Sequence, residues 1–300
     1  MPAPARPQST RLRGDMWAVV SAVATGGGFI AAKAALQTLP PITFNAYMFG
    51  IGMLAVVVDA VISRKVAVML KVSFRQLAFL FIVAILFCGA VFCLNTALAQ
   101  SEPATVSFLS RIELVSTLLL AAIFLKERIS KSEIIGLLIV TAGIVVMRYD
   151  ASVELSRTVM LITIGSFMFG AGEVLIKSKI DWMDYRTFIF YRNLFMSVIF
   201  FIISSLWGKW VWVDDGNLMM VLIVAGIVLP YLGRLGYLKA MQNIDISRAS
   251  IIVQSQPFFA AATALAILGT FPPFKEVIGG LLIVAGVVTI KLLEKKTARV

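Results

Sequence analysis

Long apolar runs separated by short polar breaks occupy almost the whole chain. A helix needs about 20 consecutive, mostly apolar residues to cross the hydrocarbon core of a bilayer. The breaks contain prolines or charged residues and are only a few residues long, so neighbouring helices must run antiparallel. We therefore predict an all-α polytopic membrane protein with ten transmembrane helices, at residues 16–38, 42–63, 76–99, 103–125, 132–148, 157–179, 186–207, 217–239, 247–269 and 275–291.

The composition agrees with this pattern. Of the 300 residues, 60 % are hydrophobic and 14 % are charged, whereas a soluble domain carries about 25 % charged residues. The net charge of +11 would also fit a nucleic-acid-binding protein. The basic residues, however, form short clusters between the apolar runs, as they do in the cytoplasmic loops of membrane proteins. We expect a lipid bilayer around the chain and no nucleic-acid partner.

The lysine and arginine residues lie mainly at the helix ends on one side of the membrane. Eighteen of them lie on the side of both termini, against four on the opposite side, namely Arg148, Arg157, Lys209 and Lys275. Cytoplasmic loops carry such an excess. The distribution predicts a plasma (bacterial inner) membrane protein with both termini cytoplasmic. Residues 1–15 are predicted to be a disordered tail, and residues 292–300 a second cytoplasmic tail.

The two halves of the sequence resemble each other. When residues 97–147 are laid over residues 240–290, a shift of 143, eleven of the 51 pairs are identical. The most informative matches are one acidic pair, Glu133/Glu276, and two glycine pairs, Gly136/Gly279 and Gly143/Gly286. In each half the two glycines are seven residues apart, and the acidic residue lies three before the first of them. The earlier helices align at a shift of 144, which pairs Gly26/Gly170, Gly28/Gly172, Lys33/Lys177, Phe44/Phe188 and Tyr47/Tyr191.

Each half holds five predicted helices, the first in residues 16–150 and the second in residues 151–291. Because five is odd, the second copy must enter the membrane from the opposite side, which predicts an inverted repeat. Inverted repeats provide two related conformations that open to opposite faces of the membrane. The sequence therefore points to alternating access as the mechanism.

Among the ionisable residues inside the predicted spans, eight stand out, because charge there is costly and usually faces a cavity or a partner. They are Lys33, Asp59, Arg111, Glu113, Glu173, Lys177, Arg192 and Arg234. Asp59 lies near a helix end, so we expect a structural role for it. Lys33 and Lys177 are close enough to a helix end to snorkel, so for these two and for Arg234 a cavity role and a structural role both remain open.

Arg111 and Glu113 lie about 12–15 Å deep in their predicted helix, at 1.5 Å per residue. Two residues apart, they point about 200° away from each other and cannot pair well. The repeat aligns Arg111 with Gln254 and Glu113 with Gln256. We expect these four side chains to meet near the midplane and to line a transport cavity. The alternative is a buried salt bridge that only locks helices together.

Glu173 and Lys177 are spaced i, i+4 and could pair on one helix. Glu173 has Phe29 as its counterpart in the first half, which favours a functional role for the acid. The predicted substrate-binding residues are Arg111, Glu113, Glu173, Gln254, Gln256, Lys33, Lys177 and Arg234.

Other chemistry is not indicated. The chain has no histidine, and its two cysteines, Cys88 and Cys93, are spaced so that they fall on different faces of one helix. We therefore predict no disulfide, no metal, no cofactor and no enzymatic activity. The glycines at 26–28, 170 and 172 are the small residues that let membrane helices approach closely. A phosphate-binding loop would need a P-loop lysine after a strand, and none is present.

Both halves carry motifs of a known family. The matching segments are "IEL" at 112–114, "LKERIS" at 125–130, "GLLIVTAG" at 136–143, "QPFF" at 256–259 and "GGLLIVAG" at 279–286, together with Arg192 in "FYRN". In these segments the chain resembles the drug/metabolite transporter superfamily, in its EamA-like branch. It departs from the family at Leu114, where a proline is expected, and at Met48, where the first half is expected to carry an arginine. The resemblance implies ten helices around a central cavity, with the fifth and tenth helices peripheral.

These observations predict a secondary transporter for a small polar or amphipathic metabolite. An amino acid or related zwitterion is the first choice, and an organic anion or phosphorylated metabolite the second. Protons or exchange would drive transport, with Glu113 or Glu173 as the proton carrier, and the chain would act as a monomer or homodimer. A non-transporting scaffold and a passive channel of the same architecture are the alternatives.

Overall fold

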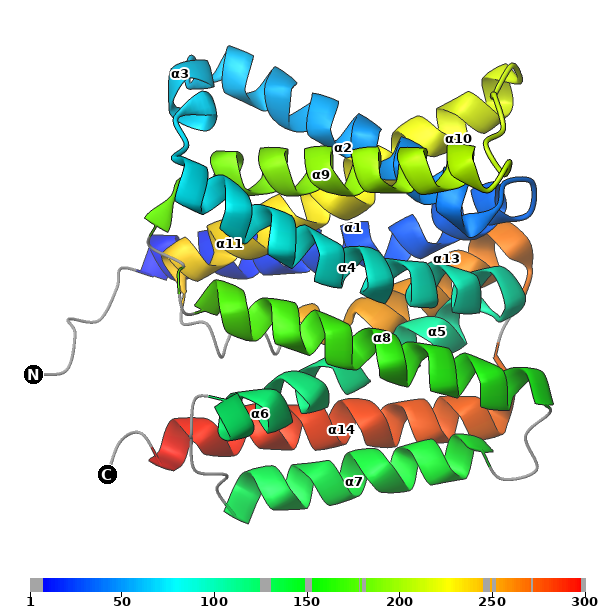
Figure 1. Cartoon of the computed structure of the whole chain (residues 1–300). Helices are drawn as coiled ribbons and strands as arrows, with labels where there is room; N and C mark the ends of the chain where they lie inside the picture. The colour runs from blue at the N-terminus through cyan, green and yellow to red at the C-terminus, as the bar shows by residue number, and fades with distance from the viewer. Residues whose placement is uncertain are drawn as a thin grey trace, which may run out of the picture.

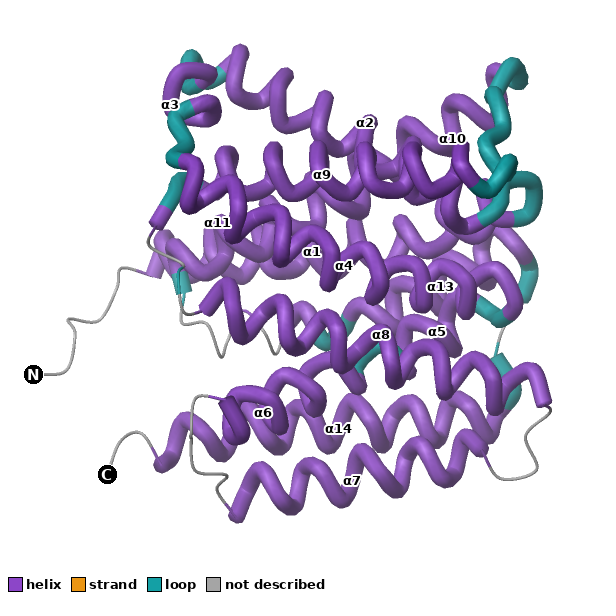
Figure 2. Tube along the Cα trace, in the orientation of Figure 1, coloured by secondary structure: helices purple, strands orange, loops and turns teal. Residues whose placement is uncertain are grey.

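The computed structural model of the chain is a bundle of helices that lie side by side (Figure 1). It describes residues 8–124, 131–148, 153–177, 179, 182–244, 249, 252–270 and 272–297. Over these residues the chain forms helices joined by short loops, and no strand (Figure 2). The helices are α1 (Gln8–Leu36), α2 (Pro41–Ile62), α3 (Val66–Leu70), α4 (Phe74–Gln100), α5 (Pro103–Leu109), α6 (Ile112–Phe124), α7 (Lys131–Arg148), α8 (Val153–Lys177), α9 (Tyr185–Leu206), α10 (Gly216–Ile227), the π-helix η2 (Val228–Gly233), α11 (Arg234–Asn243), α13 (Gln256–Leu268) and α14 (Phe274–Thr297).

Six helical segments in the described part of the chain are long and apolar enough to cross a membrane: Thr10–Leu36, Pro41–Ile62, Phe74–Gln100, Ser156–Ile176, Tyr185–Leu206 and Gly216–Ala240. Two shorter helices, Ile134–Val146 and Gln256–Leu268, are equally apolar in character. Large apolar side chains such as Ile62, Leu138 and Leu206 lie exposed on the outside. A surface of this kind requires a bilayer around it, so the chain is a membrane protein.

Two of the predicted spans are interrupted. The predicted helix at 103–125 is split into α5 and α6 at Ser110 and Arg111. The Ser110 hydroxyl donates to the Ser107 carbonyl oxygen at 2.8 Å, a local hydrogen bond that competes with regular helix. In the predicted helix at 247–269, a turn at Gln254 and Ser255 precedes α13.

The predicted helix at 217–239 is continuous but not uniform. It consists of α10, the wider turn of η2, and α11. Pro230 lies inside η2. Proline lacks the backbone N–H that an α-helix needs and clashes with the preceding turn. A π-helical turn absorbs that disruption, and such turns are frequent at functional sites.

The chain ends are more helical than predicted. α1 begins at Gln8, so residues 8–15 are helix and not part of a disordered tail. Gly14 packs against Ile244 and Asn243 at the end of α11, which gives this first turn a tertiary contact. α14 continues to Thr297, beyond the predicted end of the last span at residue 291. The short helix α3 was not predicted at all.

The start of α1, helix α3 and the end of α14 lie at one end of the bundle, whereas the loop between α9 and α10 lies at the other (Figure 1). α7 packs along α14 at the edge of the bundle, and α2 packs along α9. α6 packs on α8, and α13 packs on α1.

Glycines allow these close approaches. A Cβ on Gly143 would lie 2.6 Å from the Gly279 carbonyl oxygen, and a Cβ on Gly286 would lie 2.7 Å from that of Gly136. Gly26 is equally close to the Gln256 carbonyl, and Gly28, Gly170 and Gly172 also have neighbours nearer than 3 Å. The predicted packing role is therefore confirmed for these glycines. It is wrong for Gly27, which faces open space.

This contrast predicts the effect of one methyl group at two positions. Gly143→Ala should destabilise the protein by about 1–3 kcal/mol, since backbone atoms of α14 cannot move aside cheaply. Gly27→Ala is the matched control and should be neutral or stabilising by up to about 1 kcal/mol, because alanine favours helix over glycine. Thermal unfolding midpoints of both variants in detergent check the prediction, and equal midpoints would contradict it.

Candidate functional site

A cavity of about 430 Å³ lies inside the bundle. Its wall comes from α1, α2, α4, α6, α8, α9, η2, α11 and the residues that lead into α13. Five ionisable side chains other than tyrosine line it: Arg111, Glu113, Glu173, Arg192 and Arg234. Inside a membrane such groups mark ligand or ion pathways, so this cavity is the candidate site.

Arg111 occupies the break between α5 and α6 and is only 8 % exposed. Its guanidinium donates to Gln254 Oε1 at 3.1 Å and to Gln256 Oε1 at 2.8 Å. It also donates to Ser110 Oγ at 3.1 Å. The repeat alignment predicted that these residues lie together, and the hydrogen bonds confirm that proximity. Their role in binding a substrate stays a prediction.

Glu113 stands at the start of α6 and lines the same cavity. It is partly buried. Its carboxylate makes no hydrogen bond and no ion pair with any residue that the structure describes, although the Thr117 hydroxyl donates to its backbone carbonyl at 2.8 Å. Glu113 therefore presents to the cavity a carboxyl group that no hydrogen bond or ion pair within the described residues holds.

Glu173 and Arg234 form an ion pair across the cavity, from α8 to α11, with Arg234 Nη1 3.1 Å from Glu173 Oε1. The sequence left open a pairing of Glu173 with Lys177 on the same helix. The structure gives Glu173 a partner from another helix. The side chain of Lys177 lies outside the described residues.

Arg192 lines the cavity from α9. It donates from Nε and Nη2 to Asn193 Oδ1 at 3.3 and 3.0 Å, and more weakly from Nη2 to the Pro230 carbonyl oxygen at 3.5 Å. Its guanidinium carbon lies 5.8 Å from the Phe87 ring and 5.7 Å from the Phe188 ring, within the range of cation–π attraction. No carboxylate among the described residues pairs with it.

The predicted binding set omitted Arg192, although the sequence identified it as a charge inside a span. Asn95 of α4, which also lines the cavity, was missed as well. Asparagine is uncharged, so a search for charged residues in apolar helices does not find it. Whether it lines the cavity depends on the rotation of α4 about its axis.

Lys33 does not line the cavity. Its ammonium donates to the carbonyl oxygens of Leu98, Ala99 and Ser101 at 3.0, 3.1 and 3.0 Å. The last carbonyls of a helix have no partner within that helix, so Lys33 caps the C-terminal end of α4. The snorkelling alternative describes this side chain better than the cavity role.

Asp59 has the structural role that the sequence predicted. Its Oδ2 lies 2.6 Å from Arg186 Nε, which joins α2 to α9 outside the cavity. Arg186 also donates to Ser63 Oγ at 3.3 Å.

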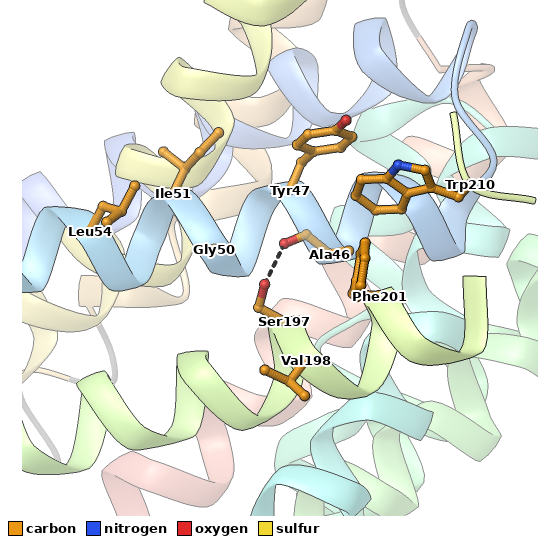
Figure 3. Close-up of a pocket in the computed structure, with 9 residues that line it drawn as sticks. All are labelled: Ala46, Tyr47, Gly50, Ile51, Leu54, Ser197, Val198, Phe201 and Trp210. Carbon is orange, nitrogen blue, oxygen red and sulfur yellow. Dashed lines mark hydrogen bonds between the residues drawn. The ribbon is translucent and has the colours of Figure 1, made fainter. Parts of the chain in front are cut away.

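A second hollow, of about 340 Å³, lies on the outside of the bundle between α2 and α9 (Figure 3). Its lining is uncharged. Tyr47 stacks on Trp210 with ring centroids 4.9 Å apart, and the Ser197 hydroxyl donates to the Ala46 carbonyl oxygen at 2.8 Å. Leu54, on its wall, is 56 % exposed. The indole Nε1 of Trp210, in the wall of this hollow, is buried and has no hydrogen-bond partner among the described residues. Without a charged side chain in its lining, the hollow is a weaker candidate site than the central cavity.

The described residues contain no group of three or more His, Cys, Asp or Glu that could hold a metal ion. Cys88 and Cys93 are both free thiols.

A bundle of apolar helices around a buried, charged cavity defines a membrane transport protein. The model of the EamA-like transporter family matches the chain twice, at residues 12–149 and 156–292. The chain belongs to the EamA-like transporter family.

Relatives of the chain are similar over long stretches. It is 23 % identical to an uncharacterized transporter of Archaeoglobus fulgidus, over 90 % of this chain and 96 % of that one. It is 23 % identical to an uncharacterized transporter of Synechocystis, over 68 % of this chain but only 62 % of that relative. A crystal structure superposes with a TM-score of 0.68 at 18 % identity, covering 98 % of this chain and 99 % of the other. At that identity the likeness shows the fold alone.

The position of Lys33 generates a prediction. Lys33→Met removes three charge-assisted hydrogen bonds and should destabilise the protein by about 1–3 kcal/mol, while Lys33→Arg, which keeps a donor, should lose less. Ligand binding should persist in both variants, because Lys33 does not line the cavity. Unfolding midpoints and ligand affinities measured on the same preparations check this. Loss of ligand binding at an unchanged unfolding midpoint would show instead that Lys33 belongs to the binding site.

Proposed function

We propose that the chain is a secondary transporter that moves a small zwitterionic metabolite through the central cavity by alternating access. One observation carries the proposal: Glu113 and Arg192 line the same cavity with opposite charges, and neither has an ionic partner among the described residues. A buried charge without a partner is unfavourable. A ligand with one ammonium and one carboxylate would satisfy both.

The remaining charges support a carboxylate on the ligand. Arg192 and Arg234 both lie 5.7 Å from the Phe188 ring, so two guanidiniums share one region of the cavity. Within the described part of the chain, Glu173 pairs with Arg234. Guanidinium groups bind carboxylate and phosphate in a bidentate manner, so an organic anion or phosphorylated metabolite is the second candidate class.

Reciprocal contacts support the inverted repeat, with ten membrane-crossing segments in two halves at 16–150 and 151–291. Gly143 packs on Gly279 as Gly286 packs on Gly136. Gly170 of α8 packs on Ser116 and Thr117 of α6, and its counterpart Gly26 of α1 packs on Gln256 and Ala260 at the start of α13. Such reciprocity is what a pseudo-two-fold axis produces.

Transport would draw on a proton or solute gradient, or on exchange, since the sequence has no ATP-binding motif. If protons are coupled, the Glu113 carboxyl group is the best-placed carrier, because it faces the cavity and no ion pair holds it. Glu173 is less suited, since Arg234 holds its carboxylate.

The orientation with both termini cytoplasmic, in the plasma membrane, rests on the lysine and arginine distribution. Basic Lys65, Lys71 and Arg75 flank α3, at the same end of the bundle as the start of α1 and the end of α14 (Figure 1). An excess of basic residues marks the cytoplasmic side.

Cysteine labelling tests this orientation in a background of Cys88→Ser and Cys93→Ser. Asp214→Cys, in the loop after α9, should react with a membrane-impermeant maleimide in intact cells. Lys71→Cys, at the opposite end, should react only after permeabilisation, because its side chain would face the cytoplasm. Labelling of Lys71→Cys in intact cells would contradict the orientation.

Glu113→Gln tests the site itself. The change keeps the shape of the side chain but removes its charge and its exchangeable proton. Uptake into proteoliposomes should fall at least tenfold, with the unfolding midpoint close to that of the wild type, since no partner is stranded. The transported probe is the compound that most stabilises wild-type protein in a thermal-shift screen of amino acids and organic anions, because a ligand raises stability by mass action.

Asp59→Asn is the matched control, because it removes a membrane carboxylate that is paired outside the cavity. It should lower the unfolding midpoint, since Arg186 is left unpaired, and leave the KM of the folded protein unchanged. Normal uptake by Glu113→Gln would remove Glu113 from the mechanism. Absence of saturable counterflow in the wild type would favour the channel or scaffold alternative.

A further inference from the structure

Two loops that the repeat relates at a shift of 144 differ in charge and lie at opposite ends of the bundle. Residues 62–75 join α2 to α4 and include α3, and residues 206–219 join α9 to α10 (Figure 1). The first loop has four basic residues and no acidic one, whereas the second has one lysine and two aspartates. We call residues 62–75 the basic loop. Its four basic side chains are all exposed, namely Arg64, Lys65, Lys71 and Arg75.

The basic loop is held in one shape by α9. Thr187 of α9 donates a hydrogen bond to the Val68 carbonyl oxygen at 3.1 Å. Tyr191, one turn further along α9, donates to the Leu70 carbonyl oxygen at 3.4 Å. Met69, between these two acceptors, is buried. The basic side chains therefore stand on a fixed backbone and not on a loose linker.

The two loops are built alike but differ at one strained position. Thr43 and Tyr47 of α2 are the counterparts of those two α9 residues, and they donate to backbone carbonyl oxygens of the second loop at 2.6 and 3.2 Å. Each loop leaves its helix through a residue with positive φ, Gly208 at 62° and Arg64 at 53°. Glycine adopts this conformation freely, whereas a side chain is strained in it. The basic loop thus carries an arginine where the equivalent loop carries glycine.

The arginine at this position indicates that its charge is needed there. Backbone strain persists chiefly where function requires the residue that bears it. Membrane topology does not require it, because basic residues orient a membrane protein by their number on one side. We therefore looked for a ligand of the basic loop.

No carboxylate of the protein itself neutralises the loop. The nearby Asp59 pairs with Arg186, and Asp184 caps α9 by accepting from the Arg186 backbone N–H at 2.8 Å. Over the part of the chain that the structure describes, no ion pair reaches the four basic residues of the loop. Their positive charge is free to attract an anion.

The basic loop also exposes apolar side chains at the level where two helices leave the bilayer. α2 ends at Ile62 and α4 begins at Phe74, and both helices are long and apolar enough to cross a membrane. Ile62, Leu70 and Phe74 are 77, 51 and 85 % exposed. Basic residues beside exposed apolar ones, at the edge of the hydrocarbon core, match the phosphate and the acyl chains of a lipid.

We propose that the basic loop is a binding site for anionic phospholipids. Its basic side chains contact the lipid phosphates, and Ile62, Leu70 and Phe74 contact the upper part of the acyl chains. The loop is bonded to α9 and continuous with α2 and α4, so a lipid bound there stabilises the folded protein by mass action. The site lies outside the central cavity and is independent of the proposed transport function.

The test compares two lipids with identical acyl chains, phosphatidylglycerol and phosphatidylcholine, on the full-length protein in an uncharged detergent. Unfolding midpoints measure stabilisation, and native mass spectrometry counts bound lipids. Phosphatidylglycerol should raise the midpoint more than phosphatidylcholine does. The difference should shrink when NaCl is raised from about 0.1 M to about 0.5 M, because salt screens exposed charges.

Arg64→Gly separates lipid binding from structural support. Without lipid the variant should be at least as stable as the wild type, because glycine favours positive φ. Its affinity for phosphatidylglycerol should nevertheless fall about fivefold, the effect of one basic residue at an anionic membrane surface. A purely structural role for Arg64 predicts the reverse, namely lower stability without lipid and an unchanged preference for phosphatidylglycerol.

Lys65→Gln should weaken phosphatidylglycerol binding to a similar extent. Lys209→Gln is the matched control, because Lys209 is the repeat counterpart of Lys65 and is also exposed, at the other end of the bundle. It should bind both lipids as the wild type does.

Three outcomes would overturn the lipid site. Equal effects of the two lipids on the wild type would remove the preference for anionic lipid and favour an acidic protein as the partner of the loop. An unchanged preference in Arg64→Gly and Lys65→Gln, or an equal loss in Lys209→Gln, would show that any preference comes from elsewhere on the protein. Stabilisation by inorganic phosphate as large as that by phosphatidylglycerol would show an ion site instead.

Discussion

The hydrogen bonds from the Arg111 guanidinium to Gln254 and Gln256 join the two interrupted helices of the chain. A buried guanidinium requires acceptors, because stranding it in apolar surroundings is strongly unfavourable. Here the acceptors are neutral amide oxygens from the other half of the sequence. The amide oxygens accept hydrogen bonds from the guanidinium without cancelling its positive charge. That charge can therefore still attract an anionic group of a ligand in the cavity. The cavity depends on this bridge, since it fixes both helix breaks beside each other.

Ionisable groups in this membrane protein fall into two kinds. Asp59 with Arg186 and Glu173 with Arg234 are paired, and a pair of opposite charges is the usual way to hold charge inside a bilayer. Glu113 and Arg192 are unpaired among the described residues. Charge that the fold itself does not compensate is best explained by a ligand that compensates it. Whether an ionisable group has a partner is thus a better guide to its candidate function than its depth in the membrane.

Small residues shape the bundle around that chemistry. Lipid tails are as apolar as side chains, so membrane helices associate through close packing, and the glycine contacts between α7 and α14, α1 and α13, and α6 and α8 provide it. These contacts recur at equivalent positions of the two halves, whereas the cavity residues do not match in chemistry. Close glycine contacts therefore occur in both halves of the chain.

The sequence by itself determined the membrane class and most helix bounds, because crossing a bilayer demands long apolar runs. It also predicted that Arg111 lies beside Gln254 and Gln256, since the repeat relates those positions. Only the tertiary structure decided that Glu173 pairs with Arg234, that Arg192 enters the cavity and that Lys33 leaves it to cap α4. Each of these outcomes depends on the rotation of a helix against neighbours distant in sequence. When a helix is apolar on every side, its sequence has no periodic pattern that indicates which side faces the cavity.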